Sequence, residues 1–107
     1  MSYQVLLLPE AEEDIFEIYK HILINDTPSK ADYVFNKIEE ACQSLIDLPD
    51  RGHIPPELKR VGIISYKEIH FKPYRIIYET EGRKIYIHAV LDERRELQEL
   101  LENRLLR

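Results

Sequence analysis

The chain is poor in cysteine and glycine, and each shortage excludes a class of site. Its 107 residues include one cysteine, Cys42, so no disulfide forms within the chain. Cys42 lies in an apolar pattern with helical spacing, and we expect it to pack in the core, because a nucleophilic cysteine needs a positioned base. The three glycines form no phosphate-binding motif. A lone reduced thiol is typical of a cytoplasmic protein.

Long hydrophobic runs are also missing. The longest is Val5–Leu8, far shorter than the stretch of about 20 residues that spans a membrane. No basic segment precedes a long apolar one, so the sequence predicts neither a signal peptide nor a membrane partner. We find no linker-like stretch or internal repeat, and the length suits a single domain over residues 1–107.

Negative charge is concentrated in one half of the chain. Residues 1–50 contain three lysines and eleven acidic residues, a net charge of −8, whereas residues 51–107 have a net charge of +3. The C-terminal half is therefore the part suited to an anionic partner. With −5 in total, the chain is not typical of a general nucleic-acid-binding protein, and we expect no direct sequence-specific binding of nucleic acid.

The N-terminal half predicts a strand followed by two helices. Residues 3–8 have too little polar alternation for one wet face, so we expect an interior or partly covered strand. Pro9 and the acids of the next turn are typical of a helix start, and apolar spacing predicts a helix over residues 9–23. Thr27 is the expected N-cap of a second helix, which runs to about Leu48. Two amphipathic helices with so short a link predict an antiparallel helical hairpin.

The C-terminal half predicts three strands and a helix. After a loop over residues 53–62, β-branched and aromatic residues predict a strand over 63–71 and a β-hairpin with strands over 74–78 and 84–91. Leucines on one face predict a C-terminal helix over 96–106. The order is βααβββα. It indicates an α+β fold in which the helical hairpin packs on a small, mainly antiparallel sheet.

The β-hairpin turn decides which side chains share a face. A two-residue turn at Glu81-Gly82, with Gly82 supplying the positive φ, pairs Arg75 with His88 across the strands. The same register places Tyr86 on the face of Arg75 and His88. The sequence thus predicts a cation and two aromatic rings side by side.

This group around Arg75 is the strongest candidate for chemistry. Its guanidinium can hold a phosphate or an acidic side chain through its planar fork. Tyr86 and His88 can stack on a base or take part in proton transfer. Alternatively, Arg75 only pairs with a carboxylate of the C-terminal helix, such as Glu96 or Glu99. The residues alone leave both interpretations open.

The other polar residues show no catalytic pattern. The adjacent acids Glu12-Glu13 and Glu39-Glu40 are interpreted as solvated helix faces. The histidines are scattered without metal-ligand spacing, at His21, His53, His70 and His88. We therefore expect neither a metal nor a cofactor.

Eleven short stretches form a combined pattern over nearly the full chain. They are Tyr3–Val5, Pro9–Ile15, Ile18-Tyr19, Ala31, Leu45–Pro49, Arg51-Gly52 with Pro56–Leu58, Tyr74–Tyr78, Ile85–Val90, Asp92–Leu101 and Arg104–Arg107. In this order, the chain resembles the ParE branch of the RelE/ParE superfamily of bacterial type II toxins. The predicted βααβββα order agrees with the fold of that family. The resemblance implies a toxin that a cognate ParD-like antitoxin neutralises by wrapping it with a C-terminal segment.

The resemblance leaves three functions open. ParE-like toxins are not nucleases and poison DNA gyrase, which would make Arg75, Tyr86, His88, Arg94 and Arg95 a target-recognition surface. RelE-like toxins cut messenger RNA on the ribosome, and Arg75, His88 and Arg94 would then be catalytic. The third alternative is a toxin-fold protein without toxicity.

Departures from the nuclease pattern favour the gyrase reading. The position of a second catalytic arginine falls at Glu93 and that of a C-terminal tyrosine falls near Glu99. An acid beside the scissile phosphate repels it, and the acidic N-terminal half is a poor surface for a ribosome. Arg94 and Arg95, followed by a leucine-rich helix, resemble the ParE branch.

The helical hairpin is the expected antitoxin surface. We expect the contacts to include Ile15, Tyr19, Val34 and Ile38. A basic or neutral antitoxin segment suits this acidic half of the chain. An extended segment along a sheet edge is the alternative.

Overall fold

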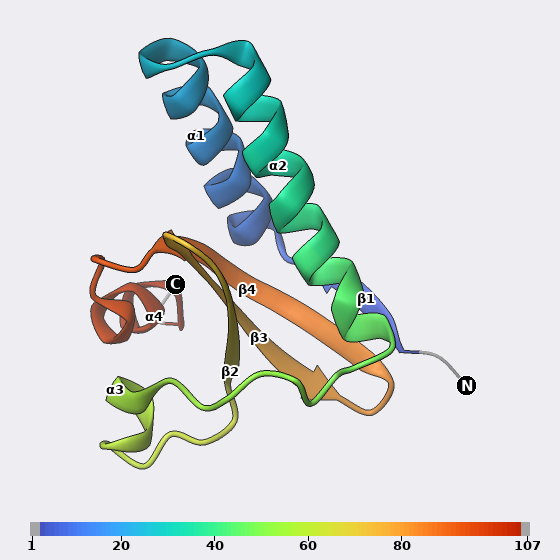
Figure 1. Cartoon of the computed structure of the whole chain (residues 1–107). Coiled ribbons are helices and arrows are strands. Elements are labelled where there is room, and N and C mark those ends of the chain that lie inside the picture. The colour runs from blue at the N-terminus through green and yellow to red at the C-terminus, as the bar shows by residue number, and fades with distance from the viewer. Residues whose placement is uncertain (1–2, 106–107) are drawn as a thin grey trace.

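The computed structural model describes residues 3–105, and a four-stranded sheet lies at its centre (Figure 1). The strands are β1 (Gln4–Leu7), β2 (Lys67–Phe71), β3 (Tyr74–Glu81) and β4 (Lys84–Asp92). They lie in the order β1-β4-β3-β2, with β1 parallel to β4 and the other neighbours antiparallel. The α+β class and the mainly antiparallel sheet are as the sequence predicts.

Two long helices follow β1 and form the predicted antiparallel hairpin. They are α1 (Pro9–Asn25) and α2 (Pro28–Gln43), and the 3-10 turn η1 (Ser44–Ile46) follows them. Each helix has proline at its start, where the missing N–H costs no hydrogen bond. Thr27 caps α2 as predicted, because its Oγ1 accepts a hydrogen bond of 3.1 Å from the N–H of Lys30. The helix ends before the predicted Leu48, since η1 tightens the chain there.

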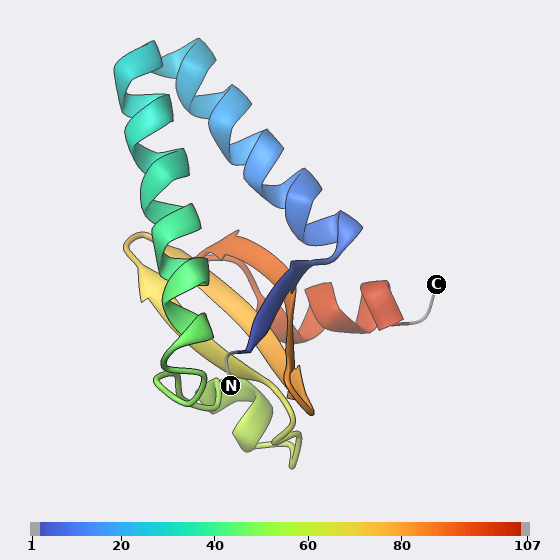
Figure 2. The same cartoon turned by 90° about the vertical axis from the view of Figure 1, so that its right-hand side faces the viewer.

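The helical hairpin covers one face of the sheet, and its tip projects past the sheet (Figure 2). Apolar side chains of both helices pack on alternate residues of β3 and β4. The buried members include Ala11, Ile15, Ala31, Val34, Ile38, Cys42, Ile76, Tyr78, Ile85 and Ile87. Burial raises the pKa of the Cys42 thiol to about 12, which fits the predicted core role of this residue.

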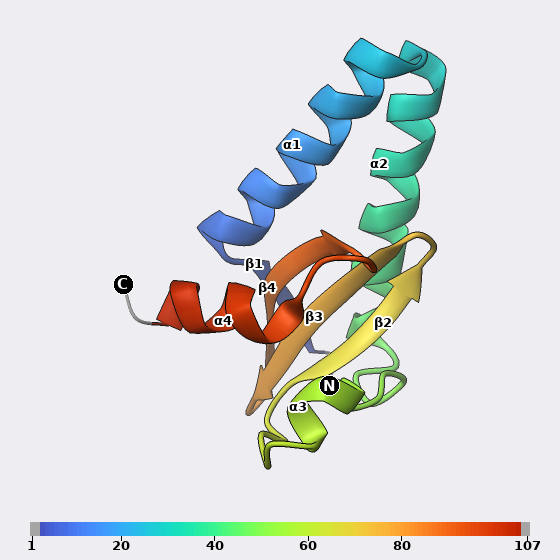
Figure 3. The ribbon, with the colours of Figure 1, turned by 90° about the vertical axis from the view of Figure 1, so that its left-hand side faces the viewer.

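Two shorter helices lie on the opposite face (Figure 3). They are α3 (Pro56–Lys59) and α4 (Leu97–Leu105). A second apolar cluster joins them to the sheet, with members Leu58, Tyr66, Ile77, Ala89, Leu91, Leu97 and Leu101. The helix α4 agrees with the predicted C-terminal helix, of which Leu106 lies outside the described residues. The predicted loop over residues 53–62 contains α3, which the sequence does not predict because Pro55-Pro56 is more typical of a loop.

The observed strands differ from the predicted ones in two respects. The strand β1 lies at the edge of the sheet and not in its interior, with Leu7 39% exposed, whereas the alternative of a partly covered strand is confirmed, because Val5 and Leu6 are half-buried. Only Lys67–Phe71 of the predicted strand over 63–71 is extended, because β2 pairs with β3 from Lys67 onward and strand propensity alone does not form a strand. Within residues 3–105, no helix combines the length and the apolar character that crossing a membrane requires.

The pairing of β3 with β4 also differs from the predicted register. The sequence places Gly82 at the second position of the two-residue loop, whereas in the structure it occupies the first, with φ of 61°. The first position is the one at which a type II′ turn requires a positive φ. A β-bulge beside Ile77 shifts the register again. Arg75 therefore lies opposite Leu91, and not opposite His88.

Candidate functional site

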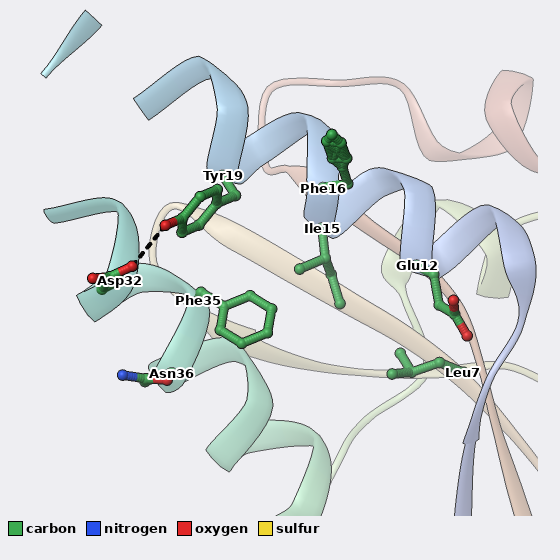
Figure 4. A pocket seen from close by; sticks show the side chains of 8 residues that line it. All are labelled: Leu7, Glu12, Ile15, Phe16, Tyr19, Asp32, Phe35 and Asn36. Carbon is green, nitrogen blue, oxygen red and sulfur yellow. Dashed lines mark hydrogen bonds between the residues drawn. The ribbon is translucent and has the colours of Figure 1, made fainter. Parts of the chain in front are cut away.

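A hollow of about 710 Å³ lies on the solvent-facing side of the helical hairpin, beside the end of β1 (Figure 4). We call it the hairpin groove. Its lining residues are spaced by three or four positions along each helix, which brings them to one side. They are Leu7, Glu12, Ile15, Phe16, Tyr19, Asp32, Phe35 and Asn36. The side chains of Phe16 and Phe35 are 54% and 39% exposed, and an exposed apolar patch of this kind marks an interaction surface.

Polar groups stand at the rim of the hairpin groove. The Tyr19 hydroxyl donates a hydrogen bond of 2.7 Å to Oδ1 of Asp32, which links the two helices. This hydrogen bond to a carboxylate raises the pKa of Tyr19 above its usual range. The Tyr19 ring also meets the ring of Phe35 edge-on, with centroids 6.1 Å apart. With Glu12 and Asp32 at its rim, the apolar groove suits an amphipathic segment that is basic or neutral.

The predicted antitoxin residues divide between the groove and the core. Ile15 and Tyr19 line the groove, whereas Val34 and Ile38 are buried against the sheet at 6% and 0% exposure. Phe16 is not among the predicted contacts, because it lies outside the apolar stripe of its helix. Aromatic residues on the otherwise polar side of a helix are the signal that identifies such a surface.

The hairpin groove borders a free edge of the sheet. Among residues 3–105, β1 pairs with β4 only, so its other edge can accept a further strand. Leu7, at the end of β1, also lines the groove. A single partner segment can therefore contact the groove and the β1 edge together.

Arg75 is buried and forms ion pairs with two acidic residues. Its Nη1 and Nη2 donate to the two carboxylate oxygens of Glu57 at 2.8 and 2.7 Å, and its Nε donates to Glu68 at 2.6 Å. These bonds, that to Glu57 foremost, raise the pKa of Arg75 above its usual range, and the same pairing lowers the pKa of Glu57. Two carboxylates thus balance the guanidinium. They belong to the α3 and β2 elements, and the proposed partners Glu96 and Glu99 are wrong.

Tyr86 and His88 share a face of the sheet with Arg75. Because the register differs from the predicted one, they lie farther from Arg75 along the strands than predicted. Tyr86 is half-buried, and the imidazole Nε2 of His88 lies 3.1 Å from a carboxylate oxygen of Glu79. The His88 ring also contacts Tyr66 edge-on, with centroids 5.1 Å apart. The predicted cluster is therefore divided, with Arg75 and His88 held by different acids.

Arg94 and Arg95 lie in the exposed turn between β4 and α4. The Arg94 side chain is 88% exposed, and its Nε and Nη2 donate to Asp92 at 2.9 and 3.1 Å. This contact raises the pKa of Arg94 and lowers that of Asp92. Both arginines are accessible to a macromolecular partner, unlike Arg75.

The fold gathers two of the scattered histidines around one carboxylate. His53 and His70 both lie beside Glu68, which is 1% exposed. The sequence spacing does not show this group, because His53 reaches β2 through a backbone bridge between distant segments.

Comparison with known proteins relates the chain to toxin-antitoxin systems. The family model described as the ParE toxin of the type II toxin-antitoxin system, parDE, matches residues 5–97. A chain of the chromosomal ParDE system from P. aeruginosa is similar in structure, with a TM-score of 0.71 and 18% identity over 84% of this chain and 95% of that chain. A chain of the toxin-antitoxin complex RelBE2 from Mycobacterium tuberculosis is also similar in structure, with a TM-score of 0.62 and 16% identity over 86% of this chain and 99% of that chain. No curated protein matches in sequence.

Proposed function

The chain belongs to the ParE toxin family of type II toxin-antitoxin systems, and from this membership we propose that it binds and inhibits DNA gyrase. In this proposal it acts in the cytoplasm, and a cognate ParD-like antitoxin neutralises it. The exposed arginines Arg94 and Arg95 contribute to gyrase recognition, together with the exposed edges of Tyr86 and His88. Arg75 is buried at 6% exposure and is therefore not part of this proposed surface.

The ion pairing of Arg75 is the observation that supports gyrase binding over RNA cleavage. A nuclease needs cationic donors aimed at the phosphate on which negative charge develops. Here all three donor groups of Arg75 hold carboxylates, and Glu93 lines the hollow in front of them. A phosphate placed there would be repelled by Glu57, Glu68 and Glu93, and the donors of Arg75 are already occupied.

Purified gyrase and relaxed plasmid DNA test this proposal. We expect the toxin to block supercoiling and to raise the amount of cleaved DNA trapped with gyrase. The double variant Arg94→Ala with Arg95→Ala should weaken this effect, and adding antitoxin should abolish it. Full supercoiling at saturating toxin, together with cleavage of messenger RNA on purified ribosomes, would establish the RelE-like alternative instead.

We place the antitoxin in the hairpin groove. The groove presents exposed Phe16 and Phe35 between acidic rim residues, so an amphipathic helix with basic or neutral polar residues is its suitable occupant. An extended part of the same antitoxin can continue along the free edge of β1. This arrangement leaves the turn with Arg94 and Arg95 uncovered.

A pair of charge insertions on α1 tests the antitoxin position. Phe16→Asp puts a charge into the groove and should weaken antitoxin binding by at least about tenfold, since a buried unpaired charge costs several times 1.4 kcal/mol. Ile24→Asp is the matched control, because Ile24 is 73% exposed at the tip and does not line the groove. Calorimetric titration with the antitoxin measures the affinity of both variants. Equal binding by the two variants would place the antitoxin elsewhere.

A further inference from the structure

Three side chains with metal-ligating atoms meet on the face of the sheet that bears α3 and α4. His70 follows Glu68 by two residues in β2, so both side chains point to the same face. His53 pairs with Glu68 in an isolated antiparallel bridge, in which each N–H donates to the other carbonyl, at 2.7 and 3.1 Å. Residues directly opposed in such a pair also share a face. The backbone itself therefore brings the three together.

The segment that bears His53 is held close against the sheet. A Cβ at Gly52 would meet the carbonyl oxygen of Glu68 and the hydroxyl of Tyr78, each at 2.6 Å, so only glycine permits this approach. The Tyr78 hydroxyl donates to the carbonyl of Pro49 at 2.9 Å and accepts from the N–H of Gly52 at 3.1 Å. These contacts fix the backbone on which the His53 side chain stands.

The ligand atoms lie within reach of a common ion. Nε2 of His53 is 3.0 Å from Oε2 of Glu68, and Nε2 of His70 is 3.2 Å from Oε1. One ligand atom from each residue can be chosen so that all three lie within 4.8 Å of one another. Zinc–nitrogen bonds of about 2.0–2.1 Å in a tetrahedral site separate two ligand nitrogens by about 3.3 Å. The side chains of His53 and His70 are 60% and 36% exposed, so small rotations close that gap.

The surrounding charge permits a divalent cation. Glu57, Glu68 and Glu93 provide three negative charges against the two guanidiniums of Arg75 and Arg60, which line the same hollow. Arg75 uses its Nε on Oε1 of Glu68 and both Nη atoms on Glu57, which leaves Oε2 of Glu68 directed to His53, while His70 lies beside Oε1. A donor that fixes one carboxylate oxygen orients the other toward a metal ion.

We propose that His53, Glu68 and His70 bind one Zn²⁺ or a similar transition-metal ion. Two imidazoles with one carboxylate are a known ligand set for open zinc sites, whereas Ca²⁺ and Mg²⁺ prefer oxygen ligands alone. The remaining coordination position faces the open hollow that Glu57, Arg60 and Glu93 also line. The bound ion joins the His53 segment to β2. This site is independent of the proposed gyrase function and departs from the sequence-based expectation of no metal.

Calorimetric titration of untagged, chelator-treated protein with ZnCl₂ tests the proposal. We expect saturable binding of one Zn²⁺ per chain, a rise in the melting temperature that EDTA reverses, and intense visible absorption with Co²⁺, as for low-coordinate nitrogen and oxygen ligands. His53→Ala and His70→Ala should each reduce affinity at least about tenfold, as removing even an indirect support of a ligand does. Both rings are exposed, so these variants should fold.

The control is His21→Ala, which removes an exposed histidine of α1 and should leave zinc affinity unchanged. Absence of saturable binding would overturn the proposal. So would equal zinc affinity in the wild type and His53→Ala. One zinc per two chains with a shift to dimers in sedimentation would also contradict it, because the ion would then bridge two molecules.

Discussion

The two faces of the sheet are stabilised in different ways. The face under the helical hairpin is mainly apolar, and its core includes Ile38 and Ile76 at 0% exposure. The opposite face combines an apolar cluster with buried charges, of which Arg75 and Glu68 are the most enclosed. In an apolar core, truncating a side chain lowers the free energy of unfolding in proportion to the cavity that it leaves. Removing one partner of a buried ion pair lowers it strongly, because the other charge stays buried without compensation.

The faces also differ in what they offer to partners. The hairpin side exposes aromatic side chains in a groove, which suits a protein partner that buries apolar surface. On the other side the buried cation is already neutralised by acids, and the exposed arginines lie in the turn before α4. In the proposed function, antitoxin binding belongs to the first face and gyrase recognition to the second.

The largest effect on stability is expected for Arg75→Ala. This change leaves Glu57 and Glu68 without their shared cation, and breaking a buried pair from one side costs about 3–5 kcal/mol. Urea unfolding followed by circular dichroism measures the free energy of unfolding. The control is Lys67→Ala, which removes an ion pair with the exposed Asp50 and should cost less than about 1 kcal/mol. Similar losses in both variants would contradict the role of Arg75.

Acid titration sharpens the same comparison. Because Arg75 lowers the pKa of Glu57 in the folded state, this contact contributes stability above the unfolded pKa of about 4.3, and the contribution is lost as the pH falls through the folded value. The wild type should therefore lose part of its stability in acid below about pH 4. Arg75→Ala should lack this part of the pH dependence. Parallel stability profiles for the two proteins would refute the coupling.

On the hairpin face, Ile38→Ala should cost about 2–4 kcal/mol. The side chain is fully buried, and its truncation leaves a cavity in the apolar core. Glu39→Ala, at the next position on the exposed side of α2, is the matched control and should change the free energy of unfolding by less than about 0.5 kcal/mol. If Ile38→Ala proves neutral, the packing of the hairpin on the sheet is not as described.

A smaller effect is expected for Arg104→Ala in α4. Arg104 donates to Asp14 of α1 at 2.6 and 3.0 Å and to the carbonyl of His88 at 2.8 Å. Losing these bonds should cost about 1–3 kcal/mol and should speed amide hydrogen exchange across Leu97–Leu105. Glu99→Ala, at an exposed position of the same helix, should leave exchange unchanged. Unaltered exchange in Arg104→Ala would show that this contact does not anchor α4.

The smallest effect on stability is expected for Arg94→Ala. Its side chain is 88% exposed, so we expect no measurable shift of the melting temperature. Inhibition of gyrase should nevertheless weaken, because the residue belongs to the proposed recognition surface. Lys84→Ala removes an exposed cation at the other end of β4 and should affect neither property. A destabilised Arg94→Ala, or one with full activity, would break the proposed separation of roles.

Local patterns predicted the elements that depend on neighbouring residues. The 3.6-residue apolar repeat of α1 and α2 is a local property, and so is the cap at Thr27, where the hydrogen-bond partner is three residues away. The β-hairpin was predicted from its strand propensity and from Gly82. Its register was wrong because both positions in the turn can accommodate glycine, and the bulge beside Ile77 has no local signal.

Contacts between distant segments could not be predicted in this way. The partners of Arg75 come from α3 and from β2, and a short helix that begins after Pro55 gives little periodic signal. The meeting of His53 with Glu68 depends on a backbone bridge and on the space left by Gly52. The groove was only partly predicted, since exposure of Phe16 follows from how α1 packs on its neighbours.

The most direct test of the account is induction of this chain alone in a bacterium, with a DNA-damage reporter and pulse labelling of protein synthesis read at early times. The account predicts a rising damage signal while translation continues, and rescue by co-expressed antitoxin. An immediate arrest of translation without DNA damage would contradict it and would indicate RNA cleavage. Normal growth at full expression would contradict it as well, and would support a toxin fold without toxicity.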